Sequence, residues 1–472
     1  MCIRGMAAPR MLYWIFSLLL MAASTYTYAQ HADSAGGKFL IRDIKVQGNR
    51  KTKTYVILRE MQLHTGDTVR TDELYEALKQ AREFIYNTTL FEEVNVVPIL
   101  VNDHEMNLVV TVVEKWYLYP IPYLELADRS FNEWVHTYHA DLKRLSYGLR
   151  FTHLNFSGNR DKLSLNAYNG FRRNISLEYH RPYINKALTN GMDARAGFSQ
   201  TKQIPYISDA ENHLLYYENG GYEKSEWNIG ASYIFRKKLK KKEYLFGGYR
   251  RVTVSDSIIK KYNPDYFNSP SATQHIIDIE YGLQYDDVDN IMYPLSGFGY
   301  SFTLKKRGLG FNGGLDMFSA TASFQRFMPA GQDWFASFAV TGEIKLPFDQ
   351  PYYNLKALGY NETYLRGLEY FVVDGSAFGL AKFDLKKKIA HINVPTFFKS
   401  EILQRIPFTF YAKTYADAGY VYSKHDARLN NRFLYSGGVG LDIVTLYDFH
   451  VSIEFSLNQL GQKGLFLHRQ EY

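Results

Sequence analysis

The stretch IIDIEYGLQY, residues 276–285, alternates between apolar and polar side chains along most of its length. Ile277 and Ile279 fall on one face of an extended strand, and Asp278 falls on the other. The stretch MFSATASFQ at 317–325 repeats the same period of two. Apolar residues outside and polar residues inside are typical of a strand in a membrane-spanning barrel. A soluble β-sandwich has the same alternation with its faces reversed, so the pattern alone leaves both folds open.

The composition favours the barrel. The chain has 472 residues, of which 16% are aromatic, including 39 Tyr and 32 Phe. Aromatic residues form interfacial girdles in outer-membrane barrels, where only every second strand residue meets lipid. The mean hydropathy of −0.31 does not indicate a helical membrane protein. A soluble β-rich protein with large cores is the alternative.

Residues 1–29 have the order of a secretory signal peptide. Arg4 and Arg10 supply the positive start, 11–23 is apolar, and 27–29 is a candidate cleavage site. An uncleaved anchor is the alternative, although the apolar part is shorter than the ~20 residues of a membrane helix. The sole cysteine, Cys2, precedes the apolar part. The mature chain is therefore expected to lack disulfides, thiol catalysis and thiolate metal sites.

A small mixed module is predicted at residues 39–115, before the alternating strands. Its apolar periodicity changes between that of strands and that of helices. Thr71 is predicted to cap the second helix, and Gly48 with Asn49 is predicted to form the turn after the first strand. The expected order is a strand at 39–46, helices at 55–62 and after 71, and strands at 91–100 and 106–113.

Residues 116–472 contain no convincing helix, and fifteen strands are expected there. A short segment at 465–472 is the candidate for a sixteenth, since bacterial barrels have even strand numbers. In such a barrel, connections after odd strands are long and extracellular, and those after even strands are short and periplasmic. A short loop near Arg172 and a long periplasmic stretch at 390–407 are exceptions to this scheme.

Several segments resemble the BamA/TamA family of outer-membrane proteins. The strongest are Tyr364-Leu365-Arg366-Gly367-Leu368 and Tyr415-Ala416-Asp417-Ala418-Gly419. The segments at 44–49 and 90–94 are similar to the opening strand and the helix-to-strand junction of the family's POTRA domain. Those at 293–297 and 438–442 are similar to its periplasmic Pro-x-x-Gly turn and its glycine-alternating penultimate region.

This resemblance implies a β-barrel membrane protein of about 16 antiparallel strands, preceded by one small α+β POTRA domain. In the family, the loop arginine enters the barrel lumen and pairs with the aspartate of a later strand. The implied lock here consists of Arg366, Gly367, Asp417 and Gly419. The sequence departs from the common family form by having Leu365 and Leu368 on either side of the Arg-Gly pair.

A seam between the first and last strands is expected, because family members insert other proteins through such a junction. Pro120 and Pro122 lie in the first expected strand, where neither can donate a ladder hydrogen bond. Phe466 and Tyr472 belong to the short last strand. Alternatively, the two prolines belong to a linker that follows the small module.

The implied function is assistance in inserting or translocating polypeptides at the outer membrane, with the POTRA domain in the periplasm. The expected partners are unfolded outer-membrane protein precursors and outer-membrane lipid, together with periplasmic chaperones or lipoprotein subunits. The alternatives are a two-partner-secretion transporter that exports one dedicated substrate, and a porin or surface receptor.

An enzymatic function is not expected, because the sequence lacks a nucleophile elbow, a zincin motif and a Walker loop. His104-Glu105 has no second histidine at the zincin spacing, and the segment from Asp287 to Asp289 lacks the later ligands of a calcium loop. We therefore expect no catalytic residue, metal or cofactor. The formal charge of +7 falls to +5 without Arg4 and Arg10, and this mild basicity does not suggest nucleic acid.

Overall fold

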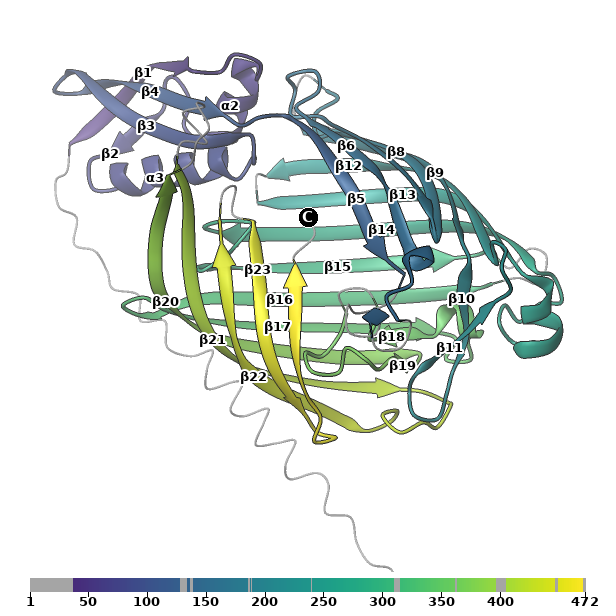
Figure 1. The fold of residues 1–472 in the computed structure, drawn as a ribbon. Helices are drawn as coiled ribbons and strands as arrows, with labels where there is room; N and C mark the ends of the chain where they lie inside the picture. Colours follow the sequence, from purple (N-terminus) through teal and green to yellow (C-terminus); the bar gives the residue numbers. More distant parts are fainter. Residues whose placement is uncertain are drawn as a thin grey trace, which may run out of the picture.

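The computed structural model describes residues 37–469 except 128–133, 136–138, 186, 188, 239, 310–314, 361–362, 396–404 and 446–448. The expected signal peptide at 1–29 and Tyr472 lie outside these residues. A small α+β module sits at one end of a large curved sheet (Figure 1). Among the described residues, no helix is both long and apolar enough to cross a membrane.

The small module is a four-stranded sheet covered by two helices. Its strand order is β2-β1-β4-β3, with β1 parallel to β4 and the other pairs antiparallel. The core lies between sheet and helices and includes Ile41, Ile57, Ile85 and Phe91, all fully buried. The elements are β1 (Lys38–Gln47), α2 (Thr54–Glu60), β2 (Thr68–Arg70), α3 (Leu74–Tyr86), β3 (Phe91–Asn102) and β4 (Glu105–Glu114).

Two details of the module differ from the sequence-based expectation. Thr71 does not cap α3: the helix begins at Leu74, and Glu73 takes the cap position without a side-chain bond. The Thr71 hydroxyl instead donates to the carbonyl of Gly37. The second difference is β2, which was not predicted because three residues are too short to show a period of two.

Within the residues that the structure describes, the large sheet has sixteen strands, so the expected even number is confirmed. All neighbours in it are antiparallel, and the order follows the sequence from β5 to β24. The strands are β5 (Leu118–Leu126), β6 (Leu145–Leu154), β7 (Lys162–Gly170), β8 (Arg172–Arg181), β9 (Asn190–Thr201), β12 (Lys224–Lys238), β13 (Lys241–Val254), β14 (Thr273–Val288), β15 (Gly297–Arg307), β16 (Met317–Gly331), β17 (Trp334–Leu346), β20 (Ala377–Pro395), β21 (Arg405–Tyr422), β22 (Phe433–Val444), β23 (His450–Asn458) and β24 (Lys463–Arg469).

The two ends of the predicted long stretch at 390–407 are strand rather than loop. The strand β20 extends to Pro395 and β21 begins at Arg405, these two residues are paired, and 396–404 lie outside the described residues. The segment reads as irregular because prolines stand at 395 and 407, close to the ends of two long strands. The short connection near Arg172 is real, since only Phe171 separates β7 from β8.

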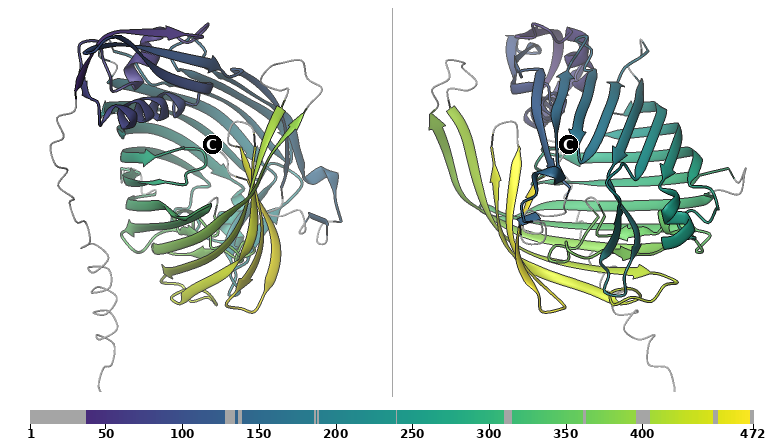
Figure 2. Two further views of the ribbon diagram at one scale, coloured as in Figure 1. Left: turned by 90° about the vertical axis from the view of Figure 1, so that its left-hand side faces the viewer. Right: turned by 45° about the vertical axis from the view of Figure 1, so that its right-hand side comes forward.

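The connections after even strands lie against the small module. The Lys53 N–H donates to the Gly158 carbonyl in the β6–β7 turn, and the Asn87 amide donates to the Val288 carbonyl at the end of β14. The long connections lie at the other end, where β10 (Gln203–Ser208), β11 (Leu214–Glu218) and η2 (Ile258–Tyr262) pack together around the buried Phe267. Figure 2 shows the small module and these connections at opposite ends of the sheet.

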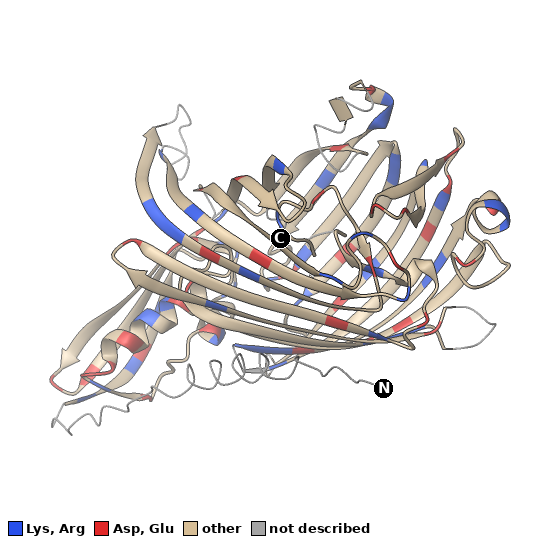
Figure 3. Cartoon of the chain, turned by 90° about the horizontal axis from the view of Figure 1, so that it is seen from below, with Lys and Arg blue, Asp and Glu red and all other residues tan. Residues whose placement is uncertain are grey.

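The sheet has an apolar outer face and a polar inner face. Ile277 and Ile279 are more than 40% exposed, whereas Asp278 between them is 4% exposed. Charged positions recur along many strands of the sheet (Figure 3). The faces are therefore those of a membrane barrel rather than those of a soluble sandwich.

Candidate functional site

The connection between β17 and β20 folds into the barrel and carries the predicted Arg-Gly pair. It contains η4 (Tyr352–Asn354), β18 (Lys356–Leu358) and β19 (Val373–Asp374). Its apolar side chains form a cluster with the inner faces of β20, β21 and β22, and Leu365 and Leu368 are 2% and 4% exposed. The leucines that depart from the common family form are thus the anchors of this loop.

Arg366 and Asp417 form a multiple contact inside the barrel. The backbone N–H and the Nε of Arg366 both donate to Asp417 Oδ2 at 2.9 Å, and Nη2 donates to Oδ1. Asp417 lies on β21, the thirteenth barrel strand. Arg366 is 7% exposed and Asp417 2% exposed, so solvent screens the pair little.

Two glycines allow the loop to approach the wall this closely. Gly367 has φ +89°, and a Cβ there would lie 2.9 Å from the Ser456 Cβ of β23. Its carbonyl accepts a 2.7 Å hydrogen bond from the Asn458 side chain. At Gly419 a Cβ would lie 3.0 Å from Leu365, so the missing side chain makes room for the loop.

Three further residues around Arg366 were not predicted from the sequence. Its Nη1 pairs with Asp384 of β20 and lies 3.6 Å from Glu454 of β23, and its guanidinium stacks 4.0 Å above the Tyr415 ring. Asp384 and Glu454 are single carboxylates on inward positions. In the sequence, the only indication of these two carboxylates is the period-two alternation of their strands. Every polar residue of the lumen shares that alternation.

The lock continues as a chain of charges along the inner wall. Glu454 pairs with Lys413 at 2.5 Å, and Lys413 pairs with Asp442 at 2.6 Å. Asp442 also pairs with Lys386 at 3.1 Å and accepts a 2.8 Å hydrogen bond from the Tyr293 hydroxyl. The sequence segments at 293–297 and 438–442, which were noted separately, therefore meet inside the barrel.

The two ends of the sheet are β5 and β24, and no strand pairing joins them in the part of the chain that the structure describes. The sheet curls so that its first strands (blue) and last strands (yellow) both come to the front of Figure 1. We call this pair of free edges the seam. Leu124 of β5 and Leu467 of β24 are 71% and 72% exposed on its two sides.

Pro120 and Pro122 lie within β5, not in a linker, and pair with Phe151 and Leu149 of β6. The carbonyl of Tyr117 and the N–H of Ala127 both bond towards β6. Because ladder bonds alternate along an antiparallel strand, the even-numbered residues of β5 direct their backbone groups to the free edge. The prolines therefore do not interrupt the backbone hydrogen bonds between β5 and β6. They leave the free edge of β5 without two N–H donors.

The last strand is held by its inner face. The Phe466 ring lies 5.7 Å from the Tyr370 ring of the luminal loop. His468 contacts Glu454 at 2.6 Å and Glu369 at 3.4 Å. Phe466, predicted as a seam residue, thus contacts the luminal loop that carries Arg366.

The predicted turn of the small module lies against its own sheet. Gly48 has φ +88°, and a Cβ there would lie 1.9 Å from the Val112 carbonyl of β4. Asn49 donates to the Thr52 carbonyl at 2.9 Å, and Thr52 shares a 2.9 Å hydrogen bond with Tyr117 just before β5. The turn therefore helps to fix the position of the segment that leads from the small module into β5.

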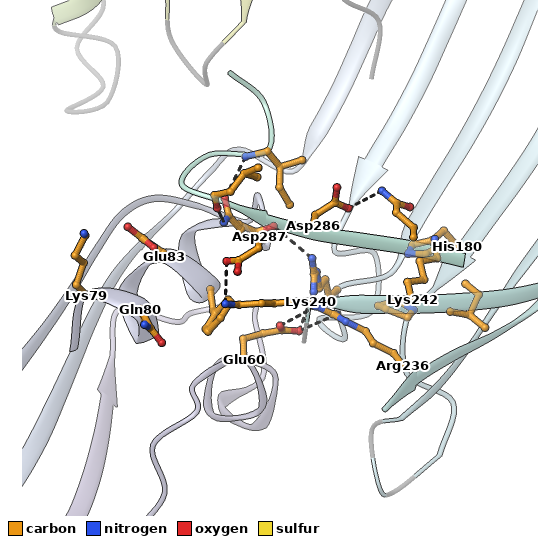
Figure 4. A pocket seen from close by; sticks show the side chains of 18 of the residues that line it. Glu60, Lys79, Gln80, Glu83, His180, Arg236, Lys240, Lys242, Asp286 and Asp287 are labelled. Carbon is orange, nitrogen blue, oxygen red and sulfur yellow. Dashed lines mark hydrogen bonds and ion pairs between the residues drawn. The ribbon is translucent and has the colours of Figure 1, made fainter. Parts of the chain in front are cut away.

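Sequence analysis missed the main contact between module and barrel, which is Glu60 at the end of α2. Its carboxylate accepts from Arg160 at 2.8 Å and from Arg236 at 3.1 Å, and it is 1% exposed (Figure 4). The Tyr183 hydroxyl also donates to it. Burial lowers the pKa of Arg160 to about 10, although the Glu60 carboxylate opposes the shift. A single glutamate at the end of a short helix gives no sequence signal for such a role, even though Glu60 shares the buried face of α2 with Val56 and Ile57.

A cavity of about 400 Å³ lies beside this contact, between α3 and the barrel rim. Lys240 pairs with Asp287 across part of it at 2.8 Å. Among the described residues, no group of three or more His, Cys, Asp or Glu side chains is arranged to hold a metal ion.

The POTRA family model, described as a surface antigen variable number repeat, matches residues 39–115. The model of the Omp85 superfamily domain matches residues 155–445. This chain belongs to the Omp85 superfamily. It is a BamA/TamA-family outer-membrane protein with a POTRA domain and a β-barrel.

Individual relatives are distant. Over 277 residues the chain is 26% identical to the outer membrane protein assembly factor BamA of Neorickettsia risticii, covering 58% of this chain and 33% of that protein. The solved structure of Haemophilus ducreyi BamA lacking POTRA domains 1–3 has a TM-score of 0.50 at 16% identity, covering 91% and 83% of the two chains. CdiB from Escherichia coli has a TM-score of 0.48 at 12% identity, covering 99% and 98%.

Proposed function

We propose that this Omp85-superfamily protein assists the insertion of other β-barrel proteins into the outer membrane. The seam is the observation that carries the proposal: in the described part of the chain no pairing joins β5 to β24, and β5 exposes an edge with two prolines. An edge that its own partner strand cannot fully satisfy is available to the strand of another chain.

The clients are unfolded outer-membrane protein precursors. A precursor strand would pair with the accessible backbone groups at the seam, and its apolar face would pass sideways into lipid. Burial of that face and strand pairing supply the free energy, so the protein needs no nucleotide, cofactor or catalytic residue. Its contribution is to lower the kinetic barrier.

The luminal lock would hold the barrel wall while the seam opens. The loop bearing Arg366 contacts β20, β21 and β23, and Tyr370 of the same loop contacts β24. These strands form the side of the barrel that ends at the seam. The lock is therefore positioned to keep β20 to β23 in place when β24 separates from β5.

The POTRA domain would face the periplasm, because it lies at the end with the short connections. The strand β3 is the edge of its sheet, and Val97 and Ile99 on it are each 52% exposed. Such an edge can receive an extended segment of a precursor by β-augmentation. Chaperones or lipoprotein subunits that deliver precursors would also meet the protein on this side.

Depletion of the protein, followed by quantitation of all outer-membrane and secreted proteins, tests the proposal. We expect a fall in many barrel proteins, with little change in outer-membrane lipoproteins. Loss of a single exported protein with other barrels intact would instead indicate a two-partner-secretion transporter. Loss of small-solute uptake alone would indicate a porin.

A further inference from the structure

The turn between β14 and β15 has a rigid, inward-folded geometry that the luminal lock does not explain. The Asp289 carboxylate accepts the N–H groups of Leu295 and Ser296, each at 3.1 Å, and the Asp289 N–H donates to the Ser296 carbonyl. These bonds close the turn on itself. They present Tyr293 to the barrel interior, where it is 5% exposed.

Tyr293 makes its contacts on distant strands. Its hydroxyl donates to Asp442 of β22 at 2.8 Å and accepts from Lys386 of β20 at 3.2 Å. The ring lies 5.2 Å from Tyr411 of β21 and 5.0 Å from His450 of β23. One side chain therefore touches four consecutive strands of the sheet.

The strand order shows that these contacts cross the barrel. The strands β14 and β15 are the eighth and ninth of the sheet, whereas β20 to β23 are the twelfth to fifteenth. Tyr411 and His450 lie near the starts of β21 and β23, at the end next to the POTRA domain. The turn thus reaches over the mouth of the lumen at that end to a part of the wall three to seven strands away.

We propose that the β14–β15 turn, through Tyr293, closes the POTRA-side mouth of the lumen as a second barrier in series with the Arg366 loop. The two barriers meet the same stretch of wall from opposite ends, linked by the chain Arg366, Glu454, Lys413, Asp442 and Tyr293. Closure of the lumen does not depend on whether clients are inserted or exported.

Ion conductance of the full-length protein in planar lipid bilayers tests this role. Two barriers in series predict that Tyr293→Ala and Arg366→Ala each raise the mean conductance modestly. The double variant should conduct several-fold more than Arg366→Ala alone. Tyr293→Phe, which keeps the ring but loses both hydroxyl contacts, should give an intermediate rise in the Arg366→Ala background.

Tyr300→Ala is the matched control, because this tyrosine lies on the adjoining strand β15 with 39% exposure on the outer face. It should leave the conductance of the Arg366→Ala protein unchanged. A double variant Arg366→Ala/Tyr293→Ala that conducts no more than Arg366→Ala, while still folded by heat-modifiable mobility, would overturn the proposal.

A reversible crosslink keeps the test independent of folding defects. With Cys2 replaced, Tyr293→Cys and Asp442→Cys would be the only thiols in the chain. In the unmodified protein the Tyr293 side chain spans the whole distance to Asp442, so two cysteines at these positions are too far apart for a direct disulfide. A reducible bifunctional thiol reagent is therefore needed. In the Arg366→Ala background, conductance should be low when crosslinked and rise several-fold on reduction. An unchanged conductance on reduction would contradict the barrier role.

Discussion

At the scale of single residues, the lock is a buried arginine surrounded by carboxylates. Arg366 meets Asp417, Asp384 and Glu454, and Lys413 balances part of the excess negative charge. Removing one member of a buried ion pair leaves the other uncompensated, which is costlier than removing both.

Arg366→Ala should lower the free energy of unfolding of the barrel by about 3–5 kcal/mol, because Asp417 stays buried without its partner. Denaturant unfolding of the reconstituted protein measures this loss. Arg366→Ala/Asp417→Ala should lose less than the sum of the single changes. Arg251→Ala, at an exposed arginine of β13, is the control. Additive single losses would show that the two residues act independently.

Gly419→Ala should destabilise the barrel by about 1–3 kcal/mol, the usual cost of overpacking, because the new Cβ meets Leu365 at 3.0 Å. Gly379→Ala is a matched control on the neighbouring strand, since a Cβ there meets nothing within 4 Å. Thermal unfolding of both variants separates the effects. Equal melting temperatures for the two would show that room for the loop is not the role of Gly419.

Part of this site could be predicted from the sequence. Arg366, Gly367, Asp417 and Gly419 stand in recognisable short motifs, and the structure brings them together. Residues such as Glu454 could not be predicted, because their partners come from strands far apart in the sequence. Only the closed barrel fixes which inward positions face each other.

At the scale of elements, the module is joined to the barrel by a buried charge cluster. Glu60 of α2 binds Arg160 from the β6–β7 turn and Arg236 from β12. These strands follow β5 in the sheet, so the module is joined to the wall next to the seam. The alternation of strand residues and the spacing of helix residues predicted the module and the barrel separately. Neither pattern contains information on the contact between the two.

Glu60→Gln should loosen the POTRA domain from the barrel, because two partly buried arginines lose the negative charge of the buried Glu60. Spin-label distances between α3 and the β12–β13 turn measure the effect as a broader distribution. Glu93→Gln, at an exposed glutamate of β3, is the matched control. A distribution as narrow as that of the unmodified protein would show that Glu60 does not set the position of the domain.

At the scale of the whole molecule, the sixteen sheet strands of the described residues curl round a locked lumen, and no pairing joins the first and last of them. The even strand number was expected because bacterial barrels have even numbers of strands, and the candidate sixteenth strand at 465–472 overlaps β24. The extension of β20 to Pro395 and the start of β21 at Arg405 were not expected, since prolines at strand ends look like those of a loop. The seam depends on the whole sheet, and only the prolines of β5 indicated it.

The most direct test of the account is client insertion by proteoliposomes that contain the variant Pro120→Val/Pro122→Val. The change restores two donors to the free edge of β5, so the seam should pair more fully with β24. We predict slower insertion of barrel precursors together with unchanged or higher thermal stability. Pro329→Val on β16, far from the seam, should insert clients at the unmodified rate. Insertion by the double variant at the unmodified rate would contradict the claim that clients enter through this seam.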